Sequence, residues 1–155
     1  MQAEIRLLRA FEKNRRTKHG SSLIETVVGS IFIVIIALFL VDVAAIVICQ
    51  TQNDALAKHC ARAASNFPNK TVADQALQKS AVDDVVNQFK ASNGGSKICV
   101  YLDYVIQSPL GSAQVLVVTR VECNFPVPIP LVGTSYITMK SEATEPVVAD
   151  VIDPI

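Results

Sequence analysis

The sequence is poor in the residues that usually carry catalysis or bind metal ions. It has two histidines among 155 residues, and only His59 comes after the first 20. Sets of a nucleophile and a base are missing, as is the glycine-rich loop that binds phosphate groups. His59 beside Cys60 has the wrong spacing for two ligands of one metal ion. We therefore expect a protein that is not an enzyme and holds no metal ion or other cofactor.

Charge is nearly absent from residues 26–49, where Asp42 is the only charged side chain. The first 20 residues hold six basic and two acidic side chains, a net charge of +4 with histidine neutral. Since the whole chain has no net charge, the remainder carries −4. Basic residues next to an apolar segment favour the cytoplasmic side of a membrane. The acidic remainder, with its scattered basic residues, predicts no nucleic-acid partner.

The apolar segment 26–49 is long enough to cross a lipid bilayer, which takes about 20 helical residues. The core of a signal peptide is shorter and has a small-x-small cleavage site close behind it. Here the nearest such site, at residues 61–63, lies too far along the chain, and Cys49 lacks the lipobox of lipoproteins. We expect a single pass through the cytoplasmic membrane, with residues 1–20 inside and residues 50–155 outside the cytoplasm.

Helical periodicity continues beyond this segment. No glycine or proline occurs from residue 50 up to Pro68, so one helix is predicted over residues 21–65, apolar all round at first and amphipathic later. Residues 66–69 end it. A second amphipathic helix follows, with Thr71 and Asp74 as its capping box. Its predicted buried stripe consists of Val72, Leu77, Ala81, Val82, Val85, Val86 and Phe89.

After the second helix the hydrophobic period changes to two, which is typical of strands. The alternation predicts strands over residues 98–106, 115–125 and 134–141, a turn at 108–112 and a proline-rich surface connection at 125–131. The tail 142–155 is a candidate fourth strand at an edge of the sheet. The predicted class is α+β, with a long N-terminal membrane-spanning helix, a second amphipathic helix and a small antiparallel sheet of three or four strands.

Four cysteines fit an oxidising location outside the cytoplasm. Cys99 and Cys123 lie symmetrically about Gly111, so they face each other in a hairpin that turns there, and we predict a disulfide between them. Cys49 and Cys60 are eleven residues apart on one helix, about 16 Å along its axis, which is too far for a bond between them. We interpret both as packed thiols.

Residues 20–25 stand between the basic leader and the apolar segment. A protease that cuts at the cytoplasmic face needs a small residue before the bond, and Gly20 supplies it, with Ser21 as the new first residue. Glu25 would then be the fifth residue of the shortened chain, and in an assembly the new amine could pair with the Glu25 carboxylate of another subunit. The alternative is that Glu25 is an interfacial acid favoured by the helix dipole.

Asp42 is the second unusual acid in this segment. Its insertion into a bilayer costs about 2.5–3.5 kcal/mol on insertion scales. Two interpretations are open at the level of sequence. Asp42 lies close enough to the outer headgroups to be hydrated, or it contacts a polar group on a partner helix and so contributes to assembly.

The segment RRTKHGSSLIETVVGSIFIVIIALFLVDVAAIV, residues 15–47, resembles the N-terminus of a type IV prepilin. The chain is most similar to the TadE/TadF-type pilin-like proteins of tight-adherence (Tad/Flp) pilus systems, which also combine one helical stem with a small β-rich part. The stretches 115–121, 125–131 and 136–141 look like their strand, proline-rich link and closing strand. The resemblance departs at Ser21, where pilins commonly begin with Phe, and at residues 24–27.

The resemblance implies a basic leader of residues 1–20, a pilin-like stem helix of residues 21–65 and an extracytoplasmic α+β domain of residues 66–155. A prepilin peptidase would cut between Gly20 and Ser21. Further implied partners are other pilins and minor pilins through the stem, membrane proteins of the pilus assembly platform, and the bilayer itself. We expect a minor pilin or pseudopilin that initiates or caps a Tad-type pilus. The alternatives are the main pilus subunit and an uncleaved membrane-anchored binding or adhesin domain.

Overall fold

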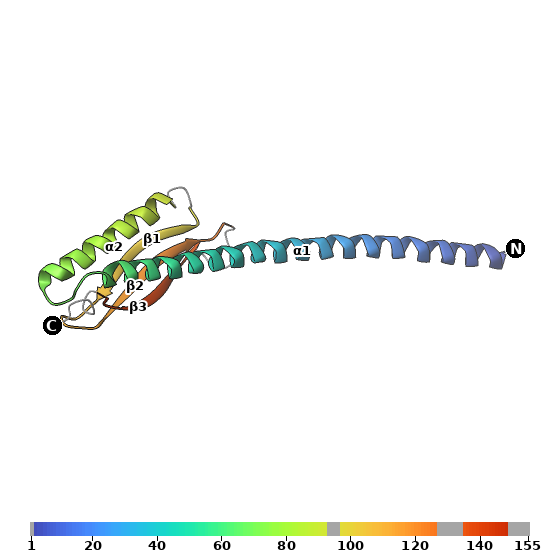
Figure 1. Ribbon diagram of the computed structural model, residues 1–155. Helices are drawn as coiled ribbons and strands as arrows, with labels where there is room; N and C mark the ends of the chain where they lie inside the picture. The colour runs from blue at the N-terminus through green and yellow to red at the C-terminus, as the bar shows by residue number, and fades with distance from the viewer. Residues whose placement is uncertain (1, 93–96, 127–134, 149–155) are drawn as a thin grey trace. The chain divides into compact units, whose positions relative to one another are not determined.

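The computed structural model of the protein describes residues 2–92, 97–126 and 135–148, with side chains from residue 22 onward. It contains two helices and three strands (Figure 1), namely α1 (Gln2–Ser65), α2 (Val72–Ser92), β1 (Cys99–Gln107), β2 (Gln114–Asn124) and β3 (Tyr136–Pro146). The predicted α+β class is confirmed, with a long apolar N-terminal helix, a second helix and an antiparallel sheet. The long helix ends at Ser65 as predicted but starts at Gln2 rather than at Ser21, because residues 2–19 contain no glycine or proline.

The environment of α1 changes at one residue. All side chains from Ser22 to Val41 are exposed. From Asp42 onward, one side of the helix is buried at every third or fourth residue, at Asp42, Ala45, Cys49, Asn53, Leu56, Ala57, Cys60, Ala61 and Ala64. This is the period of a helix that packs with one face. The chain accordingly forms two compact units, residues 1–40 and residues 41–155.

The described part of α1 from Ser22 is long and apolar enough to cross a membrane, by length and composition. The 20 exposed residues from Ser22 to Val41 are nearly all apolar and match the thickness of a bilayer core. The buried stripe that begins at Asp42 belongs to the second unit. The sequence-based segment 26–49 therefore runs some eight residues into the part of the helix that packs on the sheet.

The sheet has the strand order β1-β2-β3 with antiparallel neighbours. The predicted turn joins β1 to β2, where the Ser112 N–H donates to the Pro109 carbonyl at 2.9 Å. Gly111 has φ of 78°, the value that a type II turn requires at its third position. This turn sets the register in which Cys99 lies opposite Cys123, as the sequence predicted. A bulge interrupts β1 between Tyr101 and Asp103.

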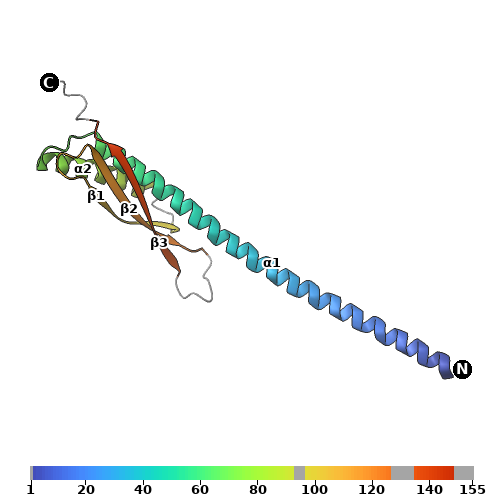
Figure 2. The ribbon, with the colours of Figure 1, turned by 90° about the horizontal axis from the view of Figure 1, so that it is seen from below.

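Both helices of the second unit pack on one face of the sheet (Figures 1 and 2). Alternate residues of β2 are fully buried on that face, which is the period of two expected for a strand with one covered side. The main core lies between α1, α2 and β2 and contains Leu56, Cys60, Ala61, Ala64, Val82, Val86, Val115, Val117 and Val147. A second, smaller cluster contains Ala45, Cys49, Cys99, Val121, Cys123 and Met139.

Two sequence predictions were wrong in detail. Val72 and Leu77 of the expected stripe of α2 are exposed, and the buried residues are Gln78, Val82 and Val86. The amide of Gln78 is buried because its Nε2 donates to the carbonyls of Phe67 and Pro68, at 3.2 and 3.3 Å. The third strand reaches Pro146, so residues 142–146 extend β3 instead of forming a fourth strand. Most of the proline-rich connection lies outside the described residues.

Candidate functional site

The residues of the predicted processing site lie within α1. Gly20 and Ser21 are part of its helical backbone, and Glu25 follows one turn later with an exposed side chain. The nearby hydroxyls bond back to the helix, since Thr26 donates to the Ser22 carbonyl at 2.9 Å and Ser30 donates to the Val27 carbonyl at 2.8 Å. These polar side chains therefore need no external partner in an apolar environment. Glu25 is the one charged group at the start of the exposed apolar run.

Asp42 lies apart from Glu25, at the point where α1 meets the second unit. Its side chain is only 5 % exposed, and it is the first buried side chain of α1 in the part whose side chains are described. Neither sequence-based interpretation anticipated burial within the chain itself. The predicted contribution of Asp42 to assembly stays a prediction.

A line of buried polar side chains ties α1 to the sheet, and sequence reasoning missed it. Asn53 and Thr119 are fully buried, and the Thr119 hydroxyl donates to Asn53 Oδ1 at 2.7 Å. Asn53 Nδ2 in turn donates to the Met139 carbonyl at 3.4 Å. At the next residue of α1, Asp54 Oδ1 accepts a hydrogen bond from the Ser141 hydroxyl at 2.6 Å. Asn53 and Asp54 thus connect α1 to both β2 and β3.

The smaller core cluster brings together three of the four cysteines. Cys49 comes from α1, Cys99 from β1 and Cys123 from β2, and their exposed fractions are 0, 4 and 0 %. All four cysteines of the chain are free thiols in this structure, so the disulfide between Cys99 and Cys123 stays a prediction. Sequence reasoning treated Cys49 as a packed thiol unrelated to that pair. The signal that could have linked them is the position of Cys49 on the stripe that begins at Asp42.

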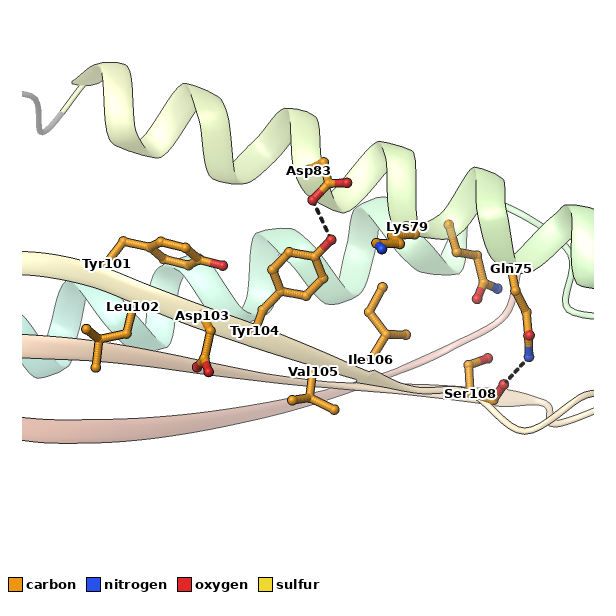
Figure 3. A pocket seen from close by; sticks show the side chains of 11 residues that line it. Gln75, Lys79, Asp83, Tyr101, Leu102, Asp103, Tyr104, Val105, Ile106 and Ser108 are labelled. Atoms are coloured by element: carbon orange, nitrogen blue, oxygen red, sulfur yellow. Dashed lines mark hydrogen bonds between the residues drawn. The ribbon is translucent and has the colours of Figure 1, made fainter.

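A cleft of about 600 Å³ lies between α2 and β1 (Figure 3). Its lining includes Lys79 and Asp83 from α2 and the six consecutive residues 101–106 of β1. The Tyr104 hydroxyl donates to Asp83 Oδ1 at 2.5 Å across the cleft. Burial, and after it the Asp83 carboxylate, raises the pKa of Tyr104 well above its usual range, so the phenol stays protonated.

Beside Gln75 and Ser108 of the cleft lining, amide side chains hold the loop and the turn that border the cleft. Gln75 Nε2 donates to the Ser108 carbonyl at 2.7 Å, and Asn69 Nδ2 donates to the Pro109 carbonyl at 2.5 Å. Gln78 Oε1 and Ser108 Oγ are buried there without a hydrogen-bond partner among the described residues. Within the described part of the chain, no group of three or more His, Cys, Asp or Glu side chains is arranged to hold a metal ion.

Comparisons of the chain with protein-family models, with curated proteins and with solved structures find no match in any of the three.

Proposed function

We propose that the chain is a prepilin-like structural protein, a minor pilin or pseudopilin that helps to initiate or cap a Tad-type pilus. A prepilin peptidase removes residues 1–20, and the stem that starts at Ser21 anchors the protein in the cytoplasmic membrane. Residues 42–155 lie outside the cytoplasm. The stem also packs beside the stems of other pilins in the assembly.

One observation carries this proposal. A basic leader and Gly20 stand directly before 20 exposed and mostly apolar residues, Ser22 to Val41, and Glu25 lies in the first turn of that run. An acid at the margin of such a run is costly unless it finds a partner of opposite charge. Cleavage after Gly20 would create an amine at Ser21, and in an assembly that amine supplies the partner.

The way in which α1 is attached within the second unit supports a structural role. The part of α1 from Asp42 onward packs on the sheet of a small two-layer domain through its buried stripe and the Asn53 hydrogen bonds. This attachment holds the domain firmly to its stem, as a subunit that is assembled through its helix requires.

The proposal is tested by the N-terminal residue of the protein isolated from cell membranes. In cells that contain a prepilin peptidase we expect Ser21, and in the same cells without the peptidase we expect Met1 or Gln2. Replacing Gly20 by Val puts a branched side chain beside the scissile bond and should leave residues 1–20 attached to nearly all molecules. The measurement is intact-mass spectrometry of the purified membrane protein.

Gly29→Val is the matched control, because it makes the same substitution in the same helix. A Cβ at Gly29 meets no atom within 4 Å, and the variant should be cut as the wild type is. Residues 1–20 still attached to the wild-type protein in the presence of the peptidase would contradict the proposal. That outcome would favour the uncleaved membrane-anchored binding domain. The abundance of the chain in sheared pili distinguishes the proposed minor pilin from the alternative, the main pilus subunit.

A further inference from the structure

Three of the four cysteines belong to one buried cluster at the junction of α1, β1 and β2. Cys49 projects from α1 onto the end of the sheet where Cys99 and Cys123 face each other. Its thiol donates to the Ile98 carbonyl at 3.4 Å, the residue next to Cys99. The Cys49, Cys99 and Cys123 side chains pack together in the same buried cluster.

The backbone places Cys99 and Cys123 well for a bond within the sheet. The Asn124 N–H donates to the Ile98 carbonyl at 2.7 Å. Along an antiparallel ladder, hydrogen-bonded pairs of residues alternate with pairs that do not hydrogen-bond to each other. Since Ile98 and Asn124 are hydrogen-bonded, the next pair, Cys99 and Cys123, is one that is not. The Cα atoms of such pairs are typically about 4.5 Å apart, within the range that a disulfide spans.

Cys49 gives the same cluster a second choice of bond. Only two of the three thiols can be joined at one time, so one thiol always remains beside the disulfide. We propose that Cys49, Cys99 and Cys123 form a single disulfide-exchange site, in which a bond between β1 and β2 alternates with a bond that joins α1 to the sheet through Cys49.

Both steps balance without a bound cofactor. In the first step, two of the thiols lose two protons and two electrons and form an S–S bond, and the disulfide of glutathione or of a thiol oxidoreductase is reduced to two thiols. In the second step, the Cys49 thiolate attacks Cys99 Sγ, the Cys49–Cys99 bond forms and the Cys99–Cys123 bond breaks. Cys123 leaves as a thiolate and takes up the proton that Cys49 lost, so no net oxidation occurs.

The surroundings make each bond long-lived once it has formed. All three cysteines are buried, so thiols and disulfides in solution reach them slowly and exchange with solution is slow. The two forms can therefore be trapped and counted. The bond through Cys49 ties α1 to the sheet two turns after Asp42, where the packed part of the helix begins.

The experiment uses the full chain, purified in detergent, reduced, and equilibrated with mixed reduced and oxidised glutathione. Free thiols are then blocked in denaturant and the chain is digested with trypsin. Cleavage after Lys58, Lys97 and Arg120 leaves each of the four cysteines on a different peptide. We expect two linked species, one joining the Cys99 and Cys123 peptides and one that contains Cys49. Their ratio should be the same whether the sample starts reduced or oxidised.

Single substitutions to serine test the competition directly. Cys49→Ser should leave only the bond between Cys99 and Cys123, and Cys123→Ser should leave only the bond between Cys49 and Cys99. Cys60→Ser is the matched control, because Cys60 is an equally buried cysteine of α1 outside this cluster, and it should reproduce the wild-type pattern. Linked Cys99 and Cys123 peptides as the sole product, in the wild type and in every variant that retains both, would overturn the proposal. A wild-type chain without any disulfide would overturn it as well.

Discussion

At the scale of single residues, some of the side chains that hold α1 on the sheet are polar ones that a sequence pattern assigns to the surface. Asn53 lies in a stretch of polar and small residues, yet it is fully buried between β2 and β3. A buried amide is stable only when its hydrogen bonds are made. Whether a given polar residue of an amphipathic helix finds such partners depends on long-range register, which the local sequence does not encode.

Asn53→Ala should therefore lower the free energy of unfolding by about 1–3 kcal/mol, because it removes the Thr119 hydroxyl's close acceptor and leaves only the Asn53 backbone carbonyl at 3.5 Å. Thr119→Val should also be destabilising, because it removes the hydroxyl that donates to the buried Asn53 Oδ1. The double variant removes both polar groups, so it should cost clearly less than the two single changes together. Denaturant unfolding of the full chain in detergent, followed by circular dichroism, measures all three. Strict additivity would contradict the hydrogen bond as the source of the effect.

The hydrogen bond across the cleft gives a second test at this scale. Tyr104→Phe removes the hydroxyl that donates to Asp83 and should cost about 1 kcal/mol of unfolding free energy. Tyr101→Phe is the matched control. Its ring stays under the Lys90 ammonium, 4.6 Å from the ring centroid, and no hydrogen bond from its hydroxyl is described in this part of the chain. The control should stay within about 0.5 kcal/mol of the wild type. Equal losses in both variants would show that ring packing, not the hydrogen bond, is responsible.

At the scale of elements, local signals in the sequence were sufficient to predict the cap of α2, the turn after β1 and the approximate positions of the strands. The capping box of α2 forms as predicted, since the Thr71 N–H donates to Asp74 Oδ2 at 2.8 Å and the Asp74 N–H donates to Thr71 Oγ1 at 3.2 Å. The turn at Gly111 and the approximate positions of the three strands were also predicted correctly, because each depends on residues close in the chain. The buried face of α2 was not, because Gln78 is buried through contacts with the separate loop at Phe67 and Pro68.

The capping box predicts a particular dependence on pH. Hydrogen bonds from Thr71, through its side chain and then its backbone, hold the pKa of Asp74 below its usual range. The stabilisation by this carboxylate is thus fully present above the unfolded-state value of 3.8, and it is lost as the pH falls through the lower folded-state value. Thr71→Ala should cost about 1 kcal/mol at neutral pH.

The stability difference between the wild type and Asp74→Asn should shrink as the solution is acidified below pH 4. Asp84→Asn is the matched control, because Asp84 is an exposed carboxylate on the same helix and not part of the cap. Thermal unfolding at a series of pH values gives the comparison. A difference for Asp74→Asn that stays constant down to the lowest pH would exclude the carboxylate as the capping group.

At the scale of the whole molecule, the sequence locates the apolar segment but not where the packed part of α1 begins. Hydropathy alone runs on to Cys49, whereas the buried stripe starts at Asp42. The residues 43–48 are apolar whether they face lipid or flank a protein interface, so composition does not distinguish the two. Composition also does not predict that Cys49 packs against the cysteines of the sheet, because this packing depends on which face of α1 is turned toward β1 and β2.

The proposed role in assembly is tested at Glu25. If its carboxylate pairs with the amine of Ser21 from a neighbouring subunit, Glu25→Gln leaves that amine unpaired in an apolar environment. Breaking a buried pair in this way costs about 3–5 kcal/mol, so the share of the chain in sheared filaments should fall at least roughly tenfold. The membrane level and the N-terminal Ser21 should not change, because the substitution lies outside the scissile bond.

Glu142→Gln serves as the matched control for the loss of a carboxylate. Glu142 is paired with Lys140 on the exposed side of β3, and its replacement should leave the filament fraction at the wild-type level. Quantitative immunoblots of filament and membrane fractions from the same cells give the ratio. If Glu25→Gln enters filaments as the wild type does, Glu25 is an interfacial acid stabilised by the helix dipole. The register of the stems would then have to come from packing of the apolar run itself.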